Sequence, residues 1–166
     1  MACVIGVGSP SGDDQAGWRV IDTLHALGVE ALGVRLLKLD RPGTALLTQL
    51  AAEDRVVLID AIVSGARAGS VRCIERTEWP SILNAVSSHG FGLAEALALG
   101  ERLDMLPRHI ELYGIELGQA LPGEAPSSAV QAAVDTLARQ LAKILSAPIP
   151  APQTSDSRVA DQSTHP

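Results

Sequence analysis

The chain has 166 residues and a mass of 17.3 kDa, which suits one domain, and its 46% hydrophobic residues can fill a sizeable core. Its formal net charge is −6, and it lacks a basic cluster that could neutralise a row of phosphates, so we expect no nucleic-acid partner. The N-terminus "MACVIGVG" lacks the features of a signal peptide, and no run approaches 18 apolar residues, so we expect neither export nor a membrane span. Two cysteines, Cys3 and Cys73, each in an apolar strand-like run, are too few for a disulfide framework and suit the cytoplasm.

Apolar runs and helical periodicities alternate along the chain. Aromatic residues make up only 2% of it, so the core must be aliphatic. The clearest buried strand is "RVVLIDAI" at 55–62, an apolar run without alternation. In chain order we predict a strand over 2–8, a helix over 14–27, a strand over 33–39, a short helix around 45–50, strands over 55–62 and 69–75, a helix over 90–103, a strand over 108–117 and a long helix over 128–145.

This alternation predicts an α/β fold, a three-layer αβα sandwich with a mainly parallel twisted sheet flanked by helices. Ser128 and Gln131 form a capping-box pattern at the start of the last helix, which carries an apolar stripe. We therefore predict a single domain over 1–146. Residues 147–166 are rich in Pro, Ser, Thr and Asp, and we predict a disordered C-terminal tail there.

A glycine-rich loop follows the first predicted strand. Gly6, Gly8 and Gly12 form G-x-G-x-x-x-G, one residue longer than the dinucleotide fingerprint, and Asp40 ends the second strand where a ribose-binding acid would lie. However, Asp13 and Asp14 lie where the first helical turn would receive a pyrophosphate, and their charge would repel it. A nucleotide-binding module is therefore the weaker interpretation.

Three polar residues follow predicted strands or begin helices and could meet at one edge of the sheet: Asp14, Asp60 and His89. Two carboxylates and an imidazole suit a divalent ion such as zinc, nickel or manganese and leave positions open for substrate. Each residue also has a structural interpretation, because Asp13 or Asp14 could cap the first helix, Asp60 could bind turn amides and His89 could cap the helix after it.

Five blocks, in order and spacing, are similar to the hydrogenase maturation peptidases, which trim the large subunit of nickel-iron hydrogenases. The resemblance covers Val4 to about Leu145. Ser9 stands where the family has Asn, Ser88 stands where it has Pro, and the first loop is one residue short. The blocks are "GVGSPSGDDQAGWRVI", "LDRPGTALL", "VVLIDAIVSG", "VSSHGFGLAEALAL" and "LYGIELG".

Carried over by position, the resemblance implies metal binding by Asp14, Asp60 and His89. Asp14 is preferred to Asp13 because it keeps the family's interval to Gly17 and Arg19. The resemblance further implies an endopeptidase that removes a C-terminal extension from a hydrogenase large-subunit precursor, with nickel supplied by that precursor. We take Asp14 and Asp40 as catalytic candidates of an aspartic-type carboxylate site, Asp40 either activating water or orienting groups.

Other peptidase classes lack their motifs, since the chain has no G-x-S-x-G elbow, no H-E-x-x-H helix and no Cys/His pairing in an evident loop. A non-catalytic nickel- or precursor-binding chaperone on the same fold remains the alternative, because the loop around Ser9 is altered. Recognition of the individual hydrogenase is expected on the loops at 77–88 and 118–127. The sequence leaves the oligomeric state open.

Overall fold

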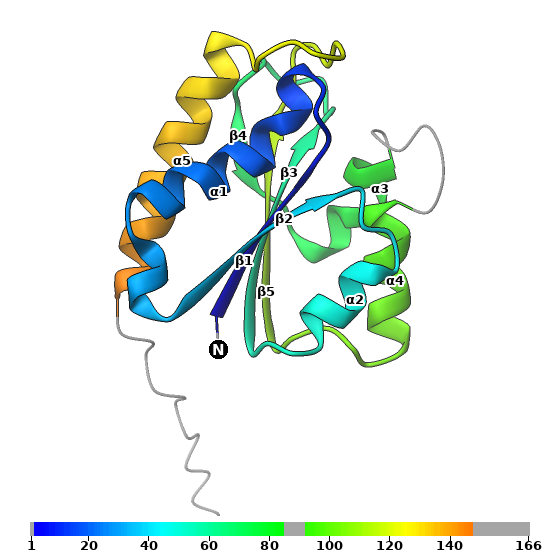
Figure 1. Ribbon diagram of the computed structural model, residues 1–166. Helices are drawn as coiled ribbons and strands as arrows, with labels where there is room; N and C mark the ends of the chain where they lie inside the picture. The colour runs from blue at the N-terminus through cyan, green and yellow to red at the C-terminus, as the bar shows by residue number, and fades with distance from the viewer. Residues whose placement is uncertain (1, 85–91, 148–166) are drawn as a thin grey trace, which may run out of the picture.

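The computed structural model describes residues 2–84 and 92–147, which form one five-stranded sheet with helices on both faces (Figure 1). The strand order is β2-β1-β3-β5-β4. Neighbouring strands pair in parallel from β2 through β5, and only β4 runs antiparallel, beside β5. The strands are β1 (Ala2–Gly8), β2 (Val34–Asp40), β3 (Arg55–Ile62), β4 (Val71–Cys73) and β5 (His109–Glu116).

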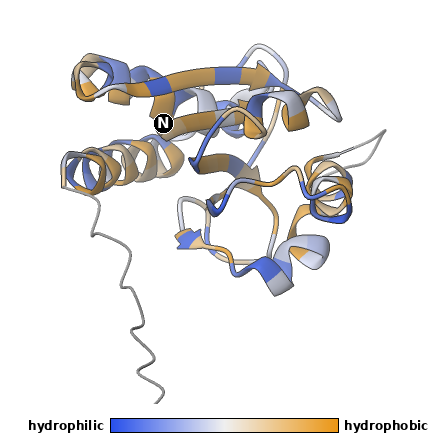
Figure 2. Cartoon of the chain, turned by 90° about the horizontal axis from the view of Figure 1, so that it is seen from below, coloured by the Kyte–Doolittle hydropathy of each residue, from blue (hydrophilic) through white to orange (hydrophobic). Residues whose placement is uncertain are grey.

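Helices α1 and α5 cover one face of the sheet, and α2, α3 and α4 cover the other (Figure 1). The apolar sides of the helices meet the apolar strands in two aliphatic cores, one on each face (Figure 2). The predicted α/β sandwich with a mainly parallel sheet is therefore confirmed. The helices are α1 (Ala16–Ala26), α2 (Ala45–Leu50), α3 (Trp79–Asn84), α4 (Leu93–Arg102) and α5 (Ser128–Ser146).

Several predicted elements differ in extent. The first helix is preceded by a separate 3-10 turn, Gly12–Gln15, because the chain tightens where it turns off β1. The strand predicted over 69–75 shrinks to β4, whose three residues are all exposed. The N-cap of α5 is Ser127, whose Oγ accepts the Val130 amide, so the predicted Ser128–Gln131 capping box is wrong.

Three further helical segments were not predicted: the 3-10 turns Val29–Leu32 and Arg76–Glu78, and α3, which begins at Trp79 inside a segment expected to be a loop. Both cysteines lie in strands, as predicted, but they differ in burial, since Cys3 is buried in β1 and Cys73 is exposed on β4. The tail prediction concerns residues that lie almost entirely outside the described ranges. Within those ranges, none of the helices combines the length and apolar character needed to cross a bilayer.

Two glycines of β1 and one of α1 allow the helix to approach the sheet closely. A Cβ on Gly6 would lie 2.2 Å from the Gly17 carbonyl oxygen, and one on Gly8 would lie 2.4 Å from the Asp14 carbonyl oxygen. A Cβ on Gly17 would in turn lie 2.3 Å from the Val7 carbonyl oxygen. The glycine pattern that resembles a nucleotide fingerprint is therefore explained by backbone packing, and this packing fixes the turn that carries Asp13 and Asp14.

Candidate active site

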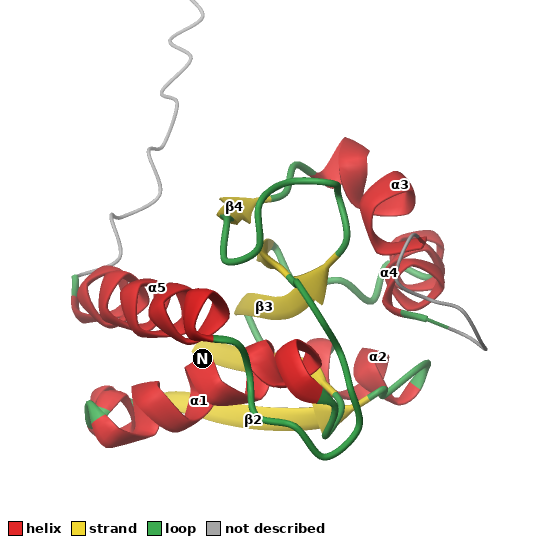
Figure 3. Ribbon diagram, turned by 90° about the horizontal axis from the view of Figure 1, so that it is seen from above, coloured by secondary structure: helices red, strands yellow, loops and turns green. Residues whose placement is uncertain are grey.

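The carboxyl ends of the four parallel strands lie together at the top of the view in Figure 1, and Figure 3 looks onto this edge from above. Asp14 reaches the edge from the 3-10 turn after β1, and Asp40 is the last residue of β2. Asp60 lies in β3, two residues before the strand ends. Topology therefore places these three predicted acids at one edge of the sheet.

Asp14 and Asp60 act on each other electrostatically. Asp60 is buried at 9% exposure, and its Oδ1 accepts the amide of Ala61 at 2.9 Å. Burial, together with the charge of Asp14, raises the pKa of Asp60 well above its usual range. Removing a carboxylate from water beside a second carboxylate is unfavourable unless a cation or a proton compensates the charge. The pair thus has the character of a functional site.

The donor set fits a divalent ion. Asp14 is partly exposed, and its backbone amide donates to the Ser11 carbonyl, but its carboxylate has no hydrogen-bond partner among the described residues and is available to a ligand. The third predicted ligand, His89, lies outside the described residues. Within 2–84 and 92–147, no group of three His, Cys, Asp or Glu side chains is gathered to hold a metal, so these residues supply two candidate ligands.

Asp13 occupies a different environment from its neighbour. It is fully buried, and its carboxylate accepts amides of Gly118 at 2.8 Å and Gln119 at 3.0 Å, together with the Ser127 amide and hydroxyl. Burial alone would raise the pKa of Asp13, but the hydrogen bonds from Ser127, Gln119 and Gly118 outweigh it and lower the pKa. With its acceptors occupied, Asp13 is a structural anion, which favours Asp14 as the ligand of the two.

Asp40 is exposed and forms a bidentate ion pair with Arg41, whose Nε and Nη2 lie 2.6 and 3.3 Å from its two carboxylate oxygens. This pair lowers the pKa of Asp40, which makes it a weaker base. Arg41 holds a left-handed backbone (φ 42°) and also feels the charge of Asp14. Arg41 was not predicted at the site, although it directly follows the candidate Asp40 in the "DRPGT" turn.

Glu116, after Asp60 and Asp13, is a third buried carboxylate at this edge and is the last residue of β5. Its Oε1 accepts the amides of Ser64 at 2.8 Å and Gly65 at 2.9 Å, and its Oε2 accepts the Ser64 hydroxyl at 2.6 Å. Sequence reasoning gave it no role. It fixes the chain that leaves β3 just after Asp60.

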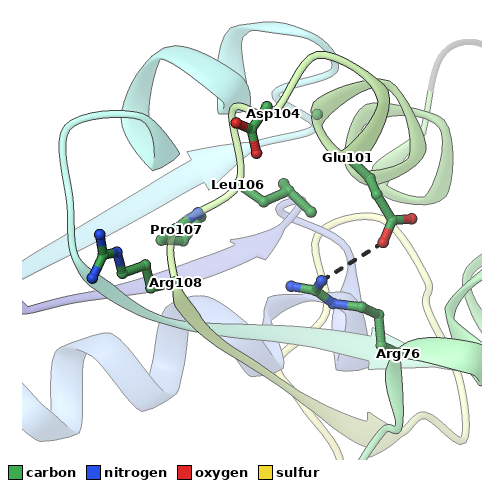
Figure 4. Close-up of a pocket in the computed structure, with 7 residues that line it drawn as sticks. Arg76, Glu101, Asp104, Leu106, Pro107 and Arg108 are labelled. Atoms are coloured by element: carbon green, nitrogen blue, oxygen red, sulfur yellow. Dashed lines mark ion pairs between the residues drawn. The ribbon is translucent and has the colours of Figure 1, made fainter. Parts of the chain in front are cut away.

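A separate depression of about 250 Å³ lies at the opposite edge of the sheet, beside the amino end of β5. Figure 4 shows Arg76 and Glu101 facing each other across it as an ion pair with a 3.6 Å Nη1–Oε1 separation. Arg108 and Asp104 also line it, so its charges are mixed. Because Arg108 directly precedes β5, this depression is remote from Asp14 and Asp60.

The family model for hydrogenase maturation protease, HycI, matches residues 19–144. The chain belongs to this family. The family resemblance carried by the five sequence blocks is thereby confirmed. Because the match begins at residue 19, it leaves the turn with Asp13 and Asp14 outside its span.

Two curated relatives agree with the family assignment. The hydrogenase expression/formation protein HupD of Thiocapsa roseopersicina is 31% identical over 116 residues, which cover 68% of this chain and 52% of that protein. The hydrogenase 2 maturation protease of Escherichia coli K12 is 30% identical over 115 residues, covering 68% of this chain and 70% of the relative. The matched region therefore spans about half of the first relative's length.

Solved structures support the same fold over most of the chain. The [NiFe] hydrogenase maturation protease HycI from Thermococcus kodakarensis matches with a TM-score of 0.68 and 26% identity, covering 87% of this chain and 91% of that one. The maturating endopeptidase HybD from Escherichia coli matches with a TM-score of 0.73 and 25% identity, with the same two coverages. The maturation protease fold therefore accounts for the observed sheet and its helices.

Proposed function

We propose that this hydrogenase maturation protease is an endopeptidase that removes a C-terminal extension from the precursor of a nickel-iron hydrogenase large subunit already loaded with nickel. The observation that carries the proposal is the pairing of the buried Asp60 with Asp14, two carboxylates whose mutual repulsion a cation relieves. Family membership supplies the class of reaction, and the name of the Escherichia coli relative, hydrogenase 2 maturation protease, supplies the class of substrate.

In this proposal Asp14, Asp60 and His89 bind the precursor's nickel. The metal belongs to the substrate and acts as a template that brings the scissile bond to the carboxyl edge of the sheet. Binding a cation between Asp14 and Asp60 replaces repulsion by attraction, so the two carboxylates favour the loaded precursor over an unloaded one. Selection for nickel then follows from charge, without a resident metal.

For Asp40 we propose the orienting role rather than that of general base. Its ion pair with Arg41 lowers the pKa of Asp40, so the carboxylate is ionised at neutral pH. A carboxylate with a lowered pKa binds a proton weakly and is therefore a poor general base. The pair instead holds the guanidinium near Asp14, where it can position Asp14 or a carbonyl of the bound peptide. An Asp40→Asn variant should then lose activity without a shift of the activity profile to higher pH.

The test is cleavage of a nickel-loaded precursor and of a nickel-free one by the purified chain, with the C-terminal mass read by mass spectrometry. We expect a C-terminal peptide to be lost only from the loaded precursor, and Asp14→Asn to abolish that loss. Asp22→Asn, the same change at an exposed residue of α1, is the matched control and should cleave like the wild type. No cleavage of the loaded cognate precursor would overturn the peptidase and leave the binding chaperone.

A further inference from the structure

Asp13 joins three segments that are far apart in the sequence. It lies in the 3-10 turn that also carries Asp14, and the amides bound to its carboxylate belong to the loop after β5 and to Ser127, the N-cap of α5. The donors are 105, 106 and 114 residues away along the chain. A single buried side chain therefore links the turn after β1 to the loop over 118–127.

Backbone contacts reinforce this link. The Asp13 amide donates to the Gln119 carbonyl at 2.9 Å, and the Gly12 amide donates to the Glu124 carbonyl at 3.2 Å. Ser11 forms an isolated β-bridge with Pro122. The approach is so close that a Cβ on Gly12 would lie 2.8 Å from the Gln119 carbonyl oxygen. The turn and the 118–127 loop thus form one unit.

The turn geometry directs Asp13 and Asp14 to different surroundings. A 3-10 helix has three residues per turn, so adjacent side chains point about 120° apart. Asp13 is directed into the 118–127 loop and is fully buried. Asp14 is partly exposed and interacts electrostatically with Asp60. Fixing one side chain therefore fixes the direction of the other.

The chemistry of the contact requires a carboxylate. Oδ2 accepts from two amides and the Ser127 hydroxyl, and Oδ1 accepts from the Ser127 amide, so all four groups around it are donors. An asparagine of the same shape would direct its NH₂ group at one of these donors. Hydrogen bonds to a buried charge are also stronger than those to a neutral amide.

We propose that Asp13 is a positioning residue, which holds Asp14 in its ligand orientation and couples that orientation to the 118–127 loop. The role in cleavage rests on the proposed function, whereas the anchoring itself does not. The exposed side chains of the loop, Leu121 among them, lie beside the same turn. A precursor that contacts this loop would therefore contact the segment that orients Asp14.

Three variants test the proposal. Asp13→Asn retains the shape and removes the charge, Ser127→Ala removes only the hydroxyl, and Asp22→Asn makes the same chemical change at an exposed site. Amide exchange by NMR reports the anchoring without substrate. We expect Asp13→Asn to speed exchange at Gly118, Gln119 and Ser127 at least tenfold and Ser127→Ala to speed it less, with Asp22→Asn unchanged. Unaltered exchange in folded Asp13→Asn would overturn the anchoring.

Positioning of Asp14 needs a readout that a purely structural anchor would not change. We choose a Ni²⁺ titration of the chain alone, followed by paramagnetic broadening of the Asp14 and Asp60 amide signals, together with kcat/KM for the loaded precursor well below the unfolding temperature. In Asp13→Asn we expect the Ni²⁺ midpoint to rise at least threefold and kcat/KM to fall at least tenfold. If this variant does not fold, Ser127→Ala is expected to show smaller changes in the same directions.

The outcomes separate the two proposals. Faster exchange with wild-type Ni²⁺ binding and cleavage would make Asp13 a structural residue only and overturn the positioning role. A wild-type chain that binds Ni²⁺ but never cleaves would overturn the proposed function, while the Ni²⁺ midpoints of the variants would still decide the role of Asp13. A wild-type chain that neither cleaves nor binds Ni²⁺ would remove the site that Asp13 is to position and overturn both.

Discussion

Buried acids at the two ends of the sheet differ in whether a neighbouring group compensates their charge. At the amino end, Glu53 is buried with 2% side-chain exposure and forms an ion pair with Arg35, with a 3.0 Å Nε–Oε1 separation. At the carboxyl end, Asp60 is equally enclosed but faces another carboxylate, Asp14, and the pKa of Asp60 rises. One end has its charge compensated within the fold, and the other retains a repulsion that a bound cation can relieve. The uncompensated charge therefore indicates that the functional site lies at the carboxyl end of the sheet.

The other two buried acids at the carboxyl end support this contrast. Asp13 and Glu116 are both surrounded by amides and a hydroxyl, so their charges are satisfied inside the protein. They hold the loops at 118–127 and at 64–65 around the edge. Compensated and uncompensated carboxylates thus lie side by side, the former fixing the loops and the latter left to a ligand.

The largest effect is expected for Asp60→Asn. Replacing the carboxylate by a neutral amide removes a candidate nickel ligand, so cleavage of the loaded precursor should fall at least about a hundredfold. The same change removes a buried, repelled charge, so the free energy of unfolding in urea should be unchanged or higher. Reduced stability with full activity would reverse the functional assignment of this end of the sheet.

Glu53→Gln makes the same chemical change at the amino end and should have the opposite outcome. It leaves the Arg35 guanidinium without its buried carboxylate, so the free energy of unfolding should fall by about 3 kcal/mol, at the lower end for a broken buried pair because Arg35 is partly exposed. Cleavage at a temperature where the variant is folded should equal that of the wild type. Urea unfolding and the cleavage assay on both variants together test the comparison.

Cys3 gives the amino end a distinct pH dependence. Burial raises the pKa of this thiol from 9.0 to about 11, although Arg35 acts in the opposite direction. The folded chain binds the thiol proton more tightly than the unfolded chain does. The contribution of the Cys3 thiol to the free energy of unfolding is therefore complete below pH 9 and is lost as the pH rises toward 11. At pH 10 the loss should be about 1 kcal/mol relative to neutral pH. It is measured as the difference between the wild type and Cys3→Ala in urea unfolding across this range, and parallel curves would contradict it.

The sequence predicts the fold well because the fold depends on local patterns. The buried run at 55–62 coincides with β3, and the apolar stripe of the last helix coincides with α5. The site topology was also predicted in part, since strand positions alone placed Asp14 and Asp60 at one sheet edge, together with His89, and Asp40 at the end of its strand. The metal-binding role of Asp14, Asp60 and His89 stays a prediction, with His89 outside the described residues.

Contacts between distant segments were beyond local reasoning. Asp13 meets donors more than 100 residues away, and no periodicity or spacing signals such a contact. The same contact explains why the N-cap of α5 is Ser127 and not the predicted Ser128. The Ser127 hydroxyl both donates to Asp13 and accepts the Val130 amide. Likewise β4 is an edge strand whose length is set by its pairing with β5, whereas the sequence predicted a longer strand over 69–75.

The smallest expected effect concerns the two thiols, which lie in the contrasting environments of β1 and β4. The pKa of both thiols is raised, to about 11 for Cys3, but Cys73 is exposed on the antiparallel edge strand, whereas Cys3 is buried beside Arg35. Because the reactive species is an accessible thiolate, iodoacetamide at pH 8 should modify Cys73 and spare Cys3 in the folded chain. Mass spectrometry should show one adduct under native conditions and two in urea, and Cys73→Ser should show none until it unfolds. Native modification of Cys3 would mean that the amino end opens readily, which is incompatible with a tightly compensated Arg35–Glu53 pair there.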